Sequence, residues 1–285
     1  MLVSVVVVCF NHADYLEECL SSIFSQSHQN FELIFIDAGS TDDSMVKVKS
    51  LSQNVDMQIY QRKGASLANN LNFGISLSKG KIFAPCAADD YWSFDKLEKQ
   101  IKAFKDSSEL FAISGNIIQV DESSIPLDKS KQFFIPKRIH LTFEDFFVSQ
   151  YYFPSVVCSY DIAKLRAIGG FPEGFGIEDW PLYLKSSLNG YKHLILPTLL
   201  GFYRKSRYQY TSNQLKMVSE QSVILAEYSD HNLYAIAKKN WGMDGATRLA
   251  SKHKKESVDL FLDSQSLKTV FDPKLYKMII KLIFR

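Results

Sequence analysis

Hydrophobic runs alternate with amphipathic stretches over the first two hundred residues of the chain. Residues 2–8 form a continuous, mostly β-branched run, which is typical of a strand covered on both faces. Similar runs at 31–36, 57–60, 81–85 and 110–120 predict further strands. Between them, apolar residues recur every three or four positions, and this spacing predicts helices. The β-α-β-α order predicts an α/β fold, with a mostly parallel sheet and helices on both faces.

The pattern changes in the second half of the chain. Residues 121–138 are polar and contain two prolines and several lysines, so we expect a loop there. Strand signals vanish beyond about Ser206. We therefore expect one domain at 1–205 and a helical extension at 206–285. Gly80, which follows the helical stripe that begins at residue 67, occupies the position expected of a C-terminal cap glycine.

Composition narrows the class of protein. The 285 residues are 46% hydrophobic and 22% charged, which is typical of a globular protein and argues against a disordered one. A formal net charge of +2 is too small to predict nucleic-acid binding. The sequence contains neither a signal peptide nor an apolar stretch long enough to span a bilayer, so we expect a cytoplasmic location. The four cysteines have no metal-binding spacing, and buried free thiols are the favoured interpretation.

Acidic residues follow three of the predicted elements. Asp37 ends the second strand, Asp89 and Asp90 follow the strand at 81–85, and Glu178 and Asp179 follow a glycine-rich turn. Each cluster alone would be ordinary as a helix cap or a solvated turn. Together they are significant, because ligands of open parallel sheets bind at the carboxyl ends of the strands. The absence of a G-x-G-x-x-G motif after the first strand argues against a nicotinamide-dependent oxidoreductase.

Five short motifs occur in order between residues 3 and 204. They are Phe10-Asn11 after the first strand, Asp37-Ala38-Gly39-Ser40-Thr41-Asp42, Asn72-Phe73-Gly74-Ile75, Ala87-Ala88-Asp89-Asp90, and Gly169-Gly170-Phe171 followed by Glu178-Asp179. In this order and spacing, the sequence resembles the family 2 glycosyltransferases. The resemblance implies a GT-A fold and an inverting transferase that uses a nucleotide-diphospho-sugar, with UDP as the expected carrier.

The resemblance also implies a divalent cofactor, Mn²⁺ or Mg²⁺. A carboxylate-bound divalent ion would stabilise the negative charge of the departing nucleoside diphosphate. We expect Asp90 to contact this metal, and Asp89 to share the metal or to hold the ribose. The remaining candidates for nucleotide-sugar binding are Cys9, Phe10, Asn11, Asp37, Asn72 and Arg204.

On the acceptor side, the resemblance makes Asp179 the general base that removes the proton of the attacking hydroxyl. Such a base typically contributes about 10²- to 10⁴-fold to the rate. Glu178 and Trp180 are candidate acceptor contacts, although Trp180 is equally well explained as a core residue of its helix. A saccharide or lipid-linked saccharide acceptor in bacterial surface polysaccharide synthesis is expected by analogy with the family.

Three departures from the family pattern leave an alternative open. Ala38 and Ala87 replace aspartates that are common in the family motifs, and Ser206 stands where many members have a histidine. The two alanine replacements suggest the alternative function, a catalytically silent module for nucleotide-sugar binding or scaffolding. The basic residues Arg204, Lys205 and Arg207 are candidates to neutralise the diphosphate, with a solvated basic loop as the competing interpretation.

The C-terminal segment at 274–285 has four basic residues and no acidic one. On a helix, its basic residues fall within a sector of about 80°, and apolar residues cover the remainder. This pattern predicts a helix that lies on an anionic membrane surface, and hence a peripheral location on the inner face of the cell membrane. Docking on the protein's own domain or on a second subunit is the alternative, and it leaves a homo-oligomer as a candidate.

Overall fold

The computed structural model describes residues 1–206, 212–264 and 282, and these residues form two compact units. Unit 1 comprises Met1–Thr142, Phe153–Gly174 and Leu182–Ser206. Unit 2 comprises Phe143–Tyr152, Phe175–Pro181 and the part of the chain that follows Ser206. Two internal segments therefore group with the C-terminal helices, and the expected domain boundary at residue 205 stays a prediction.

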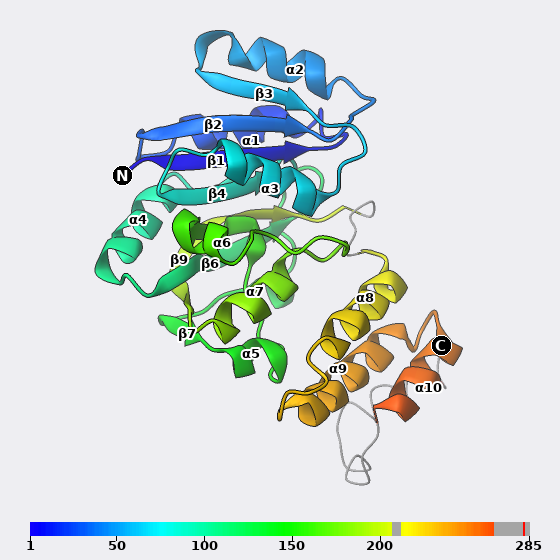
Figure 1. Cartoon of the computed structure of the whole chain (residues 1–285). Coiled ribbons are helices and arrows are strands. Elements are labelled where there is room, and N and C mark those ends of the chain that lie inside the picture. The colour runs from blue at the N-terminus through cyan, green and yellow to red at the C-terminus, as the bar shows by residue number, and fades with distance from the viewer. Residues whose placement is uncertain (207–211, 265–281, 283–285) are drawn as a thin grey trace. The chain divides into compact units, whose positions relative to one another are not determined.

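Unit 1 is built on a single mixed sheet (Figure 1). Among the described residues, nine strands follow the order β3-β2-β1-β4-β8-β6-β9-β5, with β7 beside β9. The strands are β1 Val3–Cys9, β2 Phe31–Asp37, β3 Met57–Gln61, β4 Ile82–Ala87, β5 Tyr91–Trp92, β6 Leu110–Val120, β7 Ile139–Leu141, β8 Ser159–Asp161 and β9 Lys192–Arg204. The extended pairings are parallel, whereas the antiparallel pairings all involve the short strands β5, β7 and β8.

Helices cover both faces of this sheet. In Figure 1, α1 lies behind the sheet and α3 lies in front of it. The helices of unit 1 are α1 Leu16–Phe24, α2 Ser44–Leu51, α3 Leu67–Leu77, α4 Lys96–Asp106, α6 Ile162–Ala167 and most of α7 Asp179–Leu188, with short 3-10 turns at Ser52–Asn54, Lys129–Lys131 and Ser155–Val157. Because side chains of β1 enter the core on both faces, all seven of its residues are buried.

The predicted α/β architecture is confirmed, but four of its strands, β5, β7, β8 and β9, were not predicted from the sequence. The strand β9 spans thirteen residues and pairs in parallel with β6, although no strand was predicted there. Short strands such as β5 and β8 give too little pattern to be recognised, and they form only where a longer partner is available. All four cysteines are buried free thiols, as expected.

Gly80 has a different role from the predicted helix cap. The helix α3 ends at Leu77 with Ser78 as its C-cap residue. A β-carbon at Gly80 would lie 2.6 Å from the backbone nitrogen of Ser4, and the Gly80 amide donates to Ser4 Oγ at 2.8 Å. Glycine is therefore required because the backbone packs directly against β1.

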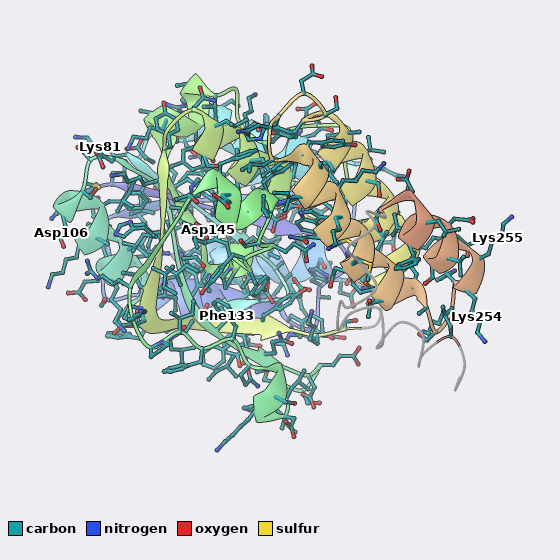
Figure 2. All side chains as sticks on the ribbon, turned by 90° about the horizontal axis from the view of Figure 1, so that it is seen from below. Lys81, Asp106, Phe133, Asp145, Lys254 and Lys255 are labelled. Atoms are coloured by element: carbon teal, nitrogen blue, oxygen red, sulfur yellow. The ribbon has the colours of Figure 1, made fainter. Side chains whose placement is uncertain are left out.

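Unit 2 is helical among its described residues. It contains α5 Phe143–Phe147, α8 Gln214–Ala226, α9 Tyr234–Leu249 and α10 Lys254–Asp263, and Figure 2 shows Lys254 and Lys255 at the start of α10. The indole nitrogen of Trp241 on α9 donates to the carbonyl of Phe147 at 2.7 Å. No helix in residues 1–206 or 212–264 is long and apolar enough to cross a membrane. The predicted amphipathic helix at 274–285 lies outside the described residues, apart from residue 282.

A buried lysine occupies the first turn of α4. The Lys96 Nζ atom donates to Gln100 Oε1 at 2.9 Å and to Ser159 Oγ at 3.2 Å, and it lies 3.8 Å from the centre of the Trp92 ring. Burial lowers the pKa of Lys96 to about 7, because removal from water disfavours the ammonium form. The unfolded chain, in contrast, keeps the ordinary pKa of lysine.

This difference predicts a pH-dependent stability. Above the folded pKa of about 7 and below the ordinary value of 10.5, the unfolded state binds more protons at Lys96 than the folded state does. The free energy of unfolding therefore gains a contribution that rises with pH, by up to about 1.4 kcal/mol per pH unit. We expect Lys96→Met to remove this rise in urea titrations made across the window. Lys102 lies on an exposed face of the same helix, so Lys102→Met should retain the rise. The same slope of unfolding free energy against pH in both variants would contradict the prediction.

Candidate functional site

Two loops at the carboxyl ends of β1 and β2 are joined by hydrogen bonds. The Asn11 Oδ1 atom accepts from the Thr41 amide at 2.7 Å, and the Asn11 amide donates to Ser40 Oγ at 2.9 Å. Asn11 has a φ of 56°, a left-handed conformation that asparagine tolerates better than most residues. The predicted donor-binding residues Asn11 and Asp37 are thus brought to one edge of the sheet.

Asp37 is fully buried and shapes its own loop. Its Oδ2 atom accepts the amides of Gly39 and Ser40, both at 3.1 Å. Five residues further on, burial acts to raise the pKa of Asp42, but hydrogen bonds from Ser44 and Ala13 outweigh it and lower the pKa. These two carboxylates therefore fix the loop by binding backbone amides.

Cys9 and Phe10, which end β1, are placed in different environments. Cys9 is buried, and burial raises the pKa of its thiol. Its carbonyl accepts the amide of Ala38 at 2.8 Å, so Cys9 contributes to the loop structure through its backbone. The side chain of Phe10 is 55% exposed, which leaves the ring available to a ligand.

The Asp89–Asp90 loop follows β4 and lies against the end of β1. The amide of Ala88 donates to the carbonyl of Val8 at 3.0 Å. Asp89 Oδ2 lies 3.8 Å from His12 Nε2, which brings the loops after β1 and β4 together. The sequence did not single out His12, although it directly follows the Phe10-Asn11 motif.

Asp90 lies deeper than Asp89. It is only 2% exposed, and its Oδ1 atom accepts the backbone amide of Arg204 at 2.8 Å. Burial, together with the neighbouring charge of Asp89, raises the pKa of Asp90 well above its usual range. One carboxylate oxygen of Asp90 is thus used to fasten the end of β9 to this loop.

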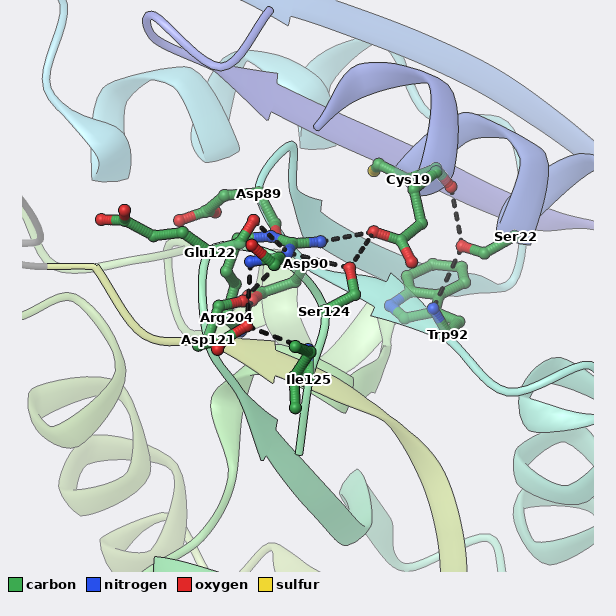
Figure 3. A network of polar contacts seen from close by, with 12 residues as sticks. Cys19, Ser22, Asp89, Asp90, Trp92, Asp121, Glu122, Ser124, Ile125 and Arg204 are labelled. Carbon is green, nitrogen blue, oxygen red and sulfur yellow. Dashed lines mark hydrogen bonds and ion pairs between the residues drawn. The ribbon is translucent and has the colours of Figure 1, made fainter. Parts of the chain in front are cut away.

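The side chain of Arg204 is buried beneath the same loop (Figure 3). Its Nε atom donates to the carbonyl of Asp89 at 2.8 Å, and its Nη2 atom forms an ion pair with Glu18 on α1. The predicted direct contact of Arg204 with the nucleotide sugar stays a prediction. Glu18 was missed because nothing near it in the sequence indicates a partner that follows 186 residues later.

Asn72 uses both ends of its amide to hold another motif. Its Nδ2 atom donates to the carbonyl of Phe171 at 2.9 Å and to Glu173 Oε1 at 3.0 Å, while its Oδ1 atom accepts the amide of Phe171 at 2.8 Å. The Gly169-Gly170-Phe171 motif is therefore attached to α3. The predicted role of Asn72 in donor binding stays a prediction.

Glu178, Asp179 and Trp180 belong to unit 2. Burial and the neighbouring Asp179 raise the pKa of Glu178 to about 8, so Glu178 is largely protonated at neutral pH. Asp179 Oδ1 accepts the amide of Trp180 at 2.7 Å. Trp180 is 8% exposed and packs on Trp241 with ring centres 4.2 Å apart, which favours the core role over acceptor stacking.

No group of three or more histidine, cysteine, aspartate or glutamate side chains suited to a metal ion occurs in the described part of the chain. Asp89 and Asp90 remain as neighbouring carboxylates. Mg²⁺ is commonly bound by one or two carboxylates together with substrate phosphates, rather than by a complete protein cage. The residues present therefore fit a divalent ion that is bound together with a diphosphate substrate.

The family can now be assigned. The model of glycosyl transferase family 2 matches residues 4–157, and the chain belongs to this family. The chain is 31% identical over 147 residues to TuaG of Bacillus subtilis (strain 168), whose name assigns it to teichuronic acid biosynthesis. This match covers 50% of the chain and 56% of TuaG. WfaP of Escherichia coli, a UDP-Glc:alpha-D-GlcNAc-diphosphoundecaprenol beta-1,3-glucosyltransferase, is 28% identical over 120 residues, which cover 42% of this chain and 48% of WfaP.

Solved structures share the fold. The 1-349 fragment of S. aureus TarS in complex with UDP-GlcNAc superposes with a TM-score of 0.66 and 19% identity, covering 99% of this chain and 82% of TarS 1-349. The mannosyltransferase PcManGT from Pyrobaculum calidifontis, in complex with GDP-Man and Mn²⁺, also gives a TM-score of 0.66, with 17% identity over 98% of this chain and 83% of that one. These likenesses confirm the predicted GT-A fold.

The contact between Asn72 and the glycine-rich motif gives a testable prediction. Gly170 has a φ of 76°, and a β-carbon there would lie 2.4 Å from Asn72 Oδ1. Gly174 has a φ of 94° with no atom within 4 Å of such a carbon. The left-handed backbone alone costs a non-glycine residue roughly 1–2 kcal/mol. We expect Gly170→Ala to lower the melting temperature clearly more than Gly174→Ala, and equal losses would contradict the contact.

Proposed function

We propose that the chain is an inverting glycosyltransferase that moves a sugar from a nucleotide-diphospho-sugar to a saccharide or lipid-linked saccharide. One observation carries this proposal. A hydrogen bond joins the loops after β1 and β2, and His12 after β1 lies 3.8 Å from Asp89 after β4, so Asn11, Asp37 and Asp89 lie at one edge of the sheet. Strand β1 has β2 on one side and β4 on the other, and the carboxyl ends of such neighbouring strands commonly bind nucleotides.

UDP is the proposed nucleotide carrier. Phe10 offers an exposed ring to a base, and the loop at Asp37 offers polar groups for recognition of the base. The UDP-GlcNAc bound to TarS and the UDP-Glc in the name of WfaP support uridine, whereas PcManGT was solved with GDP-Man. A panel of nucleotide sugars in a thermal-shift assay identifies the donor, because the true ligand stabilises the folded state.

For the metal, we propose Asp89 as the principal contact, in place of Asp90. Asp90 is the more deeply buried of the two, and one of its oxygens already accepts the Arg204 amide. Bound Mn²⁺ or Mg²⁺ would stabilise the negative charge of the departing diphosphate. The Mn²⁺ in the PcManGT complex supports a metal in this fold. Asp89 then holds the ion, and Asp90 keeps the loop in place.

We propose Asp179 as the general base. An alcohol has a pKa far above 7, so a carboxylate must take its proton as the oxygen attacks the anomeric carbon. A single displacement opposite the departing diphosphate inverts the anomeric configuration. Burial and the neighbouring Asp179 raise the pKa of Glu178, so Asp179 is the preferred base of the two.

The acceptor is proposed from the relatives. The name of WfaP describes a diphosphoundecaprenol-linked acceptor, and that of TuaG refers to teichuronic acid. We propose a role in bacterial surface polysaccharide synthesis on the inner face of the cell membrane. In this proposal residues 1–205 carry the transfer, and the segment at 274–285 contacts the membrane or a second subunit.

The first functional prediction concerns the metal. At a donor concentration about a hundred times Kd, binding should stabilise the parent protein by about 2.7 kcal/mol. Asp89→Asn should lose most of the Mn²⁺-dependent part of this shift. Asp106→Asn is the matched control, since Asp106 is an exposed carboxylate at the end of α4, outside the Asp89–Asp90 loop (Figure 2). An Asp89→Asn variant with the parental shift would refute the assignment.

The second functional prediction concerns the base. Asp179→Asn should slow transfer by about 10²- to 10⁴-fold, because the amide cannot accept the proton. Donor binding in the thermal-shift assay should stay near the parental level. Asp230→Asn, an exposed carboxylate of the same unit, serves as the control. A parent protein that binds donor but transfers to no acceptor would instead favour the catalytically silent alternative.

A further inference from the structure

Arg204 connects segments that are far apart in the sequence. Its Nη1 atom donates to the carbonyls of Asp121 and Glu122 at 3.1 and 3.2 Å, and to Ser124 Oγ at 3.0 Å. On its other side, its Nε atom donates to the carbonyl of Asp89. The guanidinium thus links the Asp89–Asp90 loop to the turn at 121–124 that follows β6.

Glu18 completes this arrangement from α1. Its Oε2 atom pairs with Arg204 Nη2 and also accepts the hydroxyl of Ser124 at 2.7 Å. The Tyr15 ring lies against the guanidinium, with Arg204 Cζ 4.4 Å from the ring centre. The arginine side chain is only 1% exposed, whereas that of Glu18 is 41% exposed. A charge buried to this degree is stable only if it is paired and hydrogen-bonded, and here several elements supply its partners.

The geometry requires a guanidinium in particular. Five N–H donors in one rigid plane can bind acceptors on different sides at once, which a lysine ammonium on a flexible stem cannot do. Arg204 directs these donors at the backbone of the loop and the turn, and its backbone amide separately holds Asp90. A side-chain substitution therefore removes the guanidinium contacts and keeps the amide bond to Asp90.

We propose that Arg204, paired with Glu18, is a positioning residue for the donor site. It holds the Asp89 backbone in the orientation in which the Asp89 carboxylate would hold the metal ion. This inference rests on the proposed function, and it assigns Arg204 to the support of the loop instead of to direct contact with the nucleotide sugar. Groups that orient metal ligands in this way typically change metal affinity or activity by about 10- to 100-fold when they are replaced.

The test compares Arg204→Met and Arg204→Lys with the parent protein. We expect Arg204→Met to raise the KM for the donor, and the Kd for Mn²⁺-dependent donor binding, by about 10- to 100-fold. Arg204→Lys, which keeps the charge but not the planar donors, should fall between the parent and Arg204→Met. Glu18→Gln, at a partly exposed site, should show a smaller increase, and it serves if Arg204→Met fails to fold.

Arg166→Met is the matched control. Arg166 also donates to two backbone carbonyls, those of Ile75 at 2.8 Å and Ser78 at 2.7 Å, but these lie at the end of α3. Its loss should lower the melting temperature and leave the KM for the donor unchanged. The proposal would be overturned by a folded Arg204→Met variant that, like this control, has a lower melting temperature and an unchanged KM for the donor.

Hydrogen exchange separates this inference from the proposed function. The amides at 88–92 and 121–125 should exchange faster in Arg204→Met than in the parent or in Arg166→Met. If the parent binds no nucleotide sugar, the proposed function fails, and the donor-site role fails with it even where exchange is faster. If the parent binds donor but exchange at both segments is unchanged in Arg204→Met, the positioning role alone is refuted.

Discussion

The candidate site depends on how buried carboxylates are satisfied at the carboxyl edge of the sheet. Asp37 and Asp90 lie almost entirely out of water, where an unpaired charge would cost several kcal/mol. Backbone amides bind both of them: Gly39 and Ser40 donate to Asp37, and Arg204 donates to Asp90. These bonds give the loops after β2 and β4 defined shapes before any ligand arrives.

This constraint divides the acidic residues into two kinds. Asp37, Asp42 and Asp90 bind amides of the chain itself, so their carboxylates maintain the loops. Asp89 Oδ2 lies 3.8 Å from His12 Nε2, so this carboxylate also faces the loop after β1. Carboxylates that are equivalent in the motif thus have different surroundings in the folded chain. Under the proposed function the departure at Ala87 is tolerable, because a diphosphate substrate would supply the missing metal ligands.

Two further candidate site residues have contacts within the chain, while their predicted ligand contacts stay predictions. Asn72 uses its whole amide to hold the Gly169-Gly170-Phe171 motif, and Trp180 packs against Trp241 in the core of unit 2. Sequence patterns do not separate contacts within the chain from contacts with ligands, because both require the same residue type at the same position.

The sequence by itself determined the α/β class, the positions of β1 to β4, and the polar loops that follow them. These features depend on local patterns, such as a buried β-branched run or a polar turn after a strand. Only the tertiary structure decided the course of β9, the close packing of Gly80 on β1, and the pairing of Arg204 with Glu18. Each of these depends on a partner far away in the chain, and a contact that chain folding creates leaves no periodic pattern around either residue.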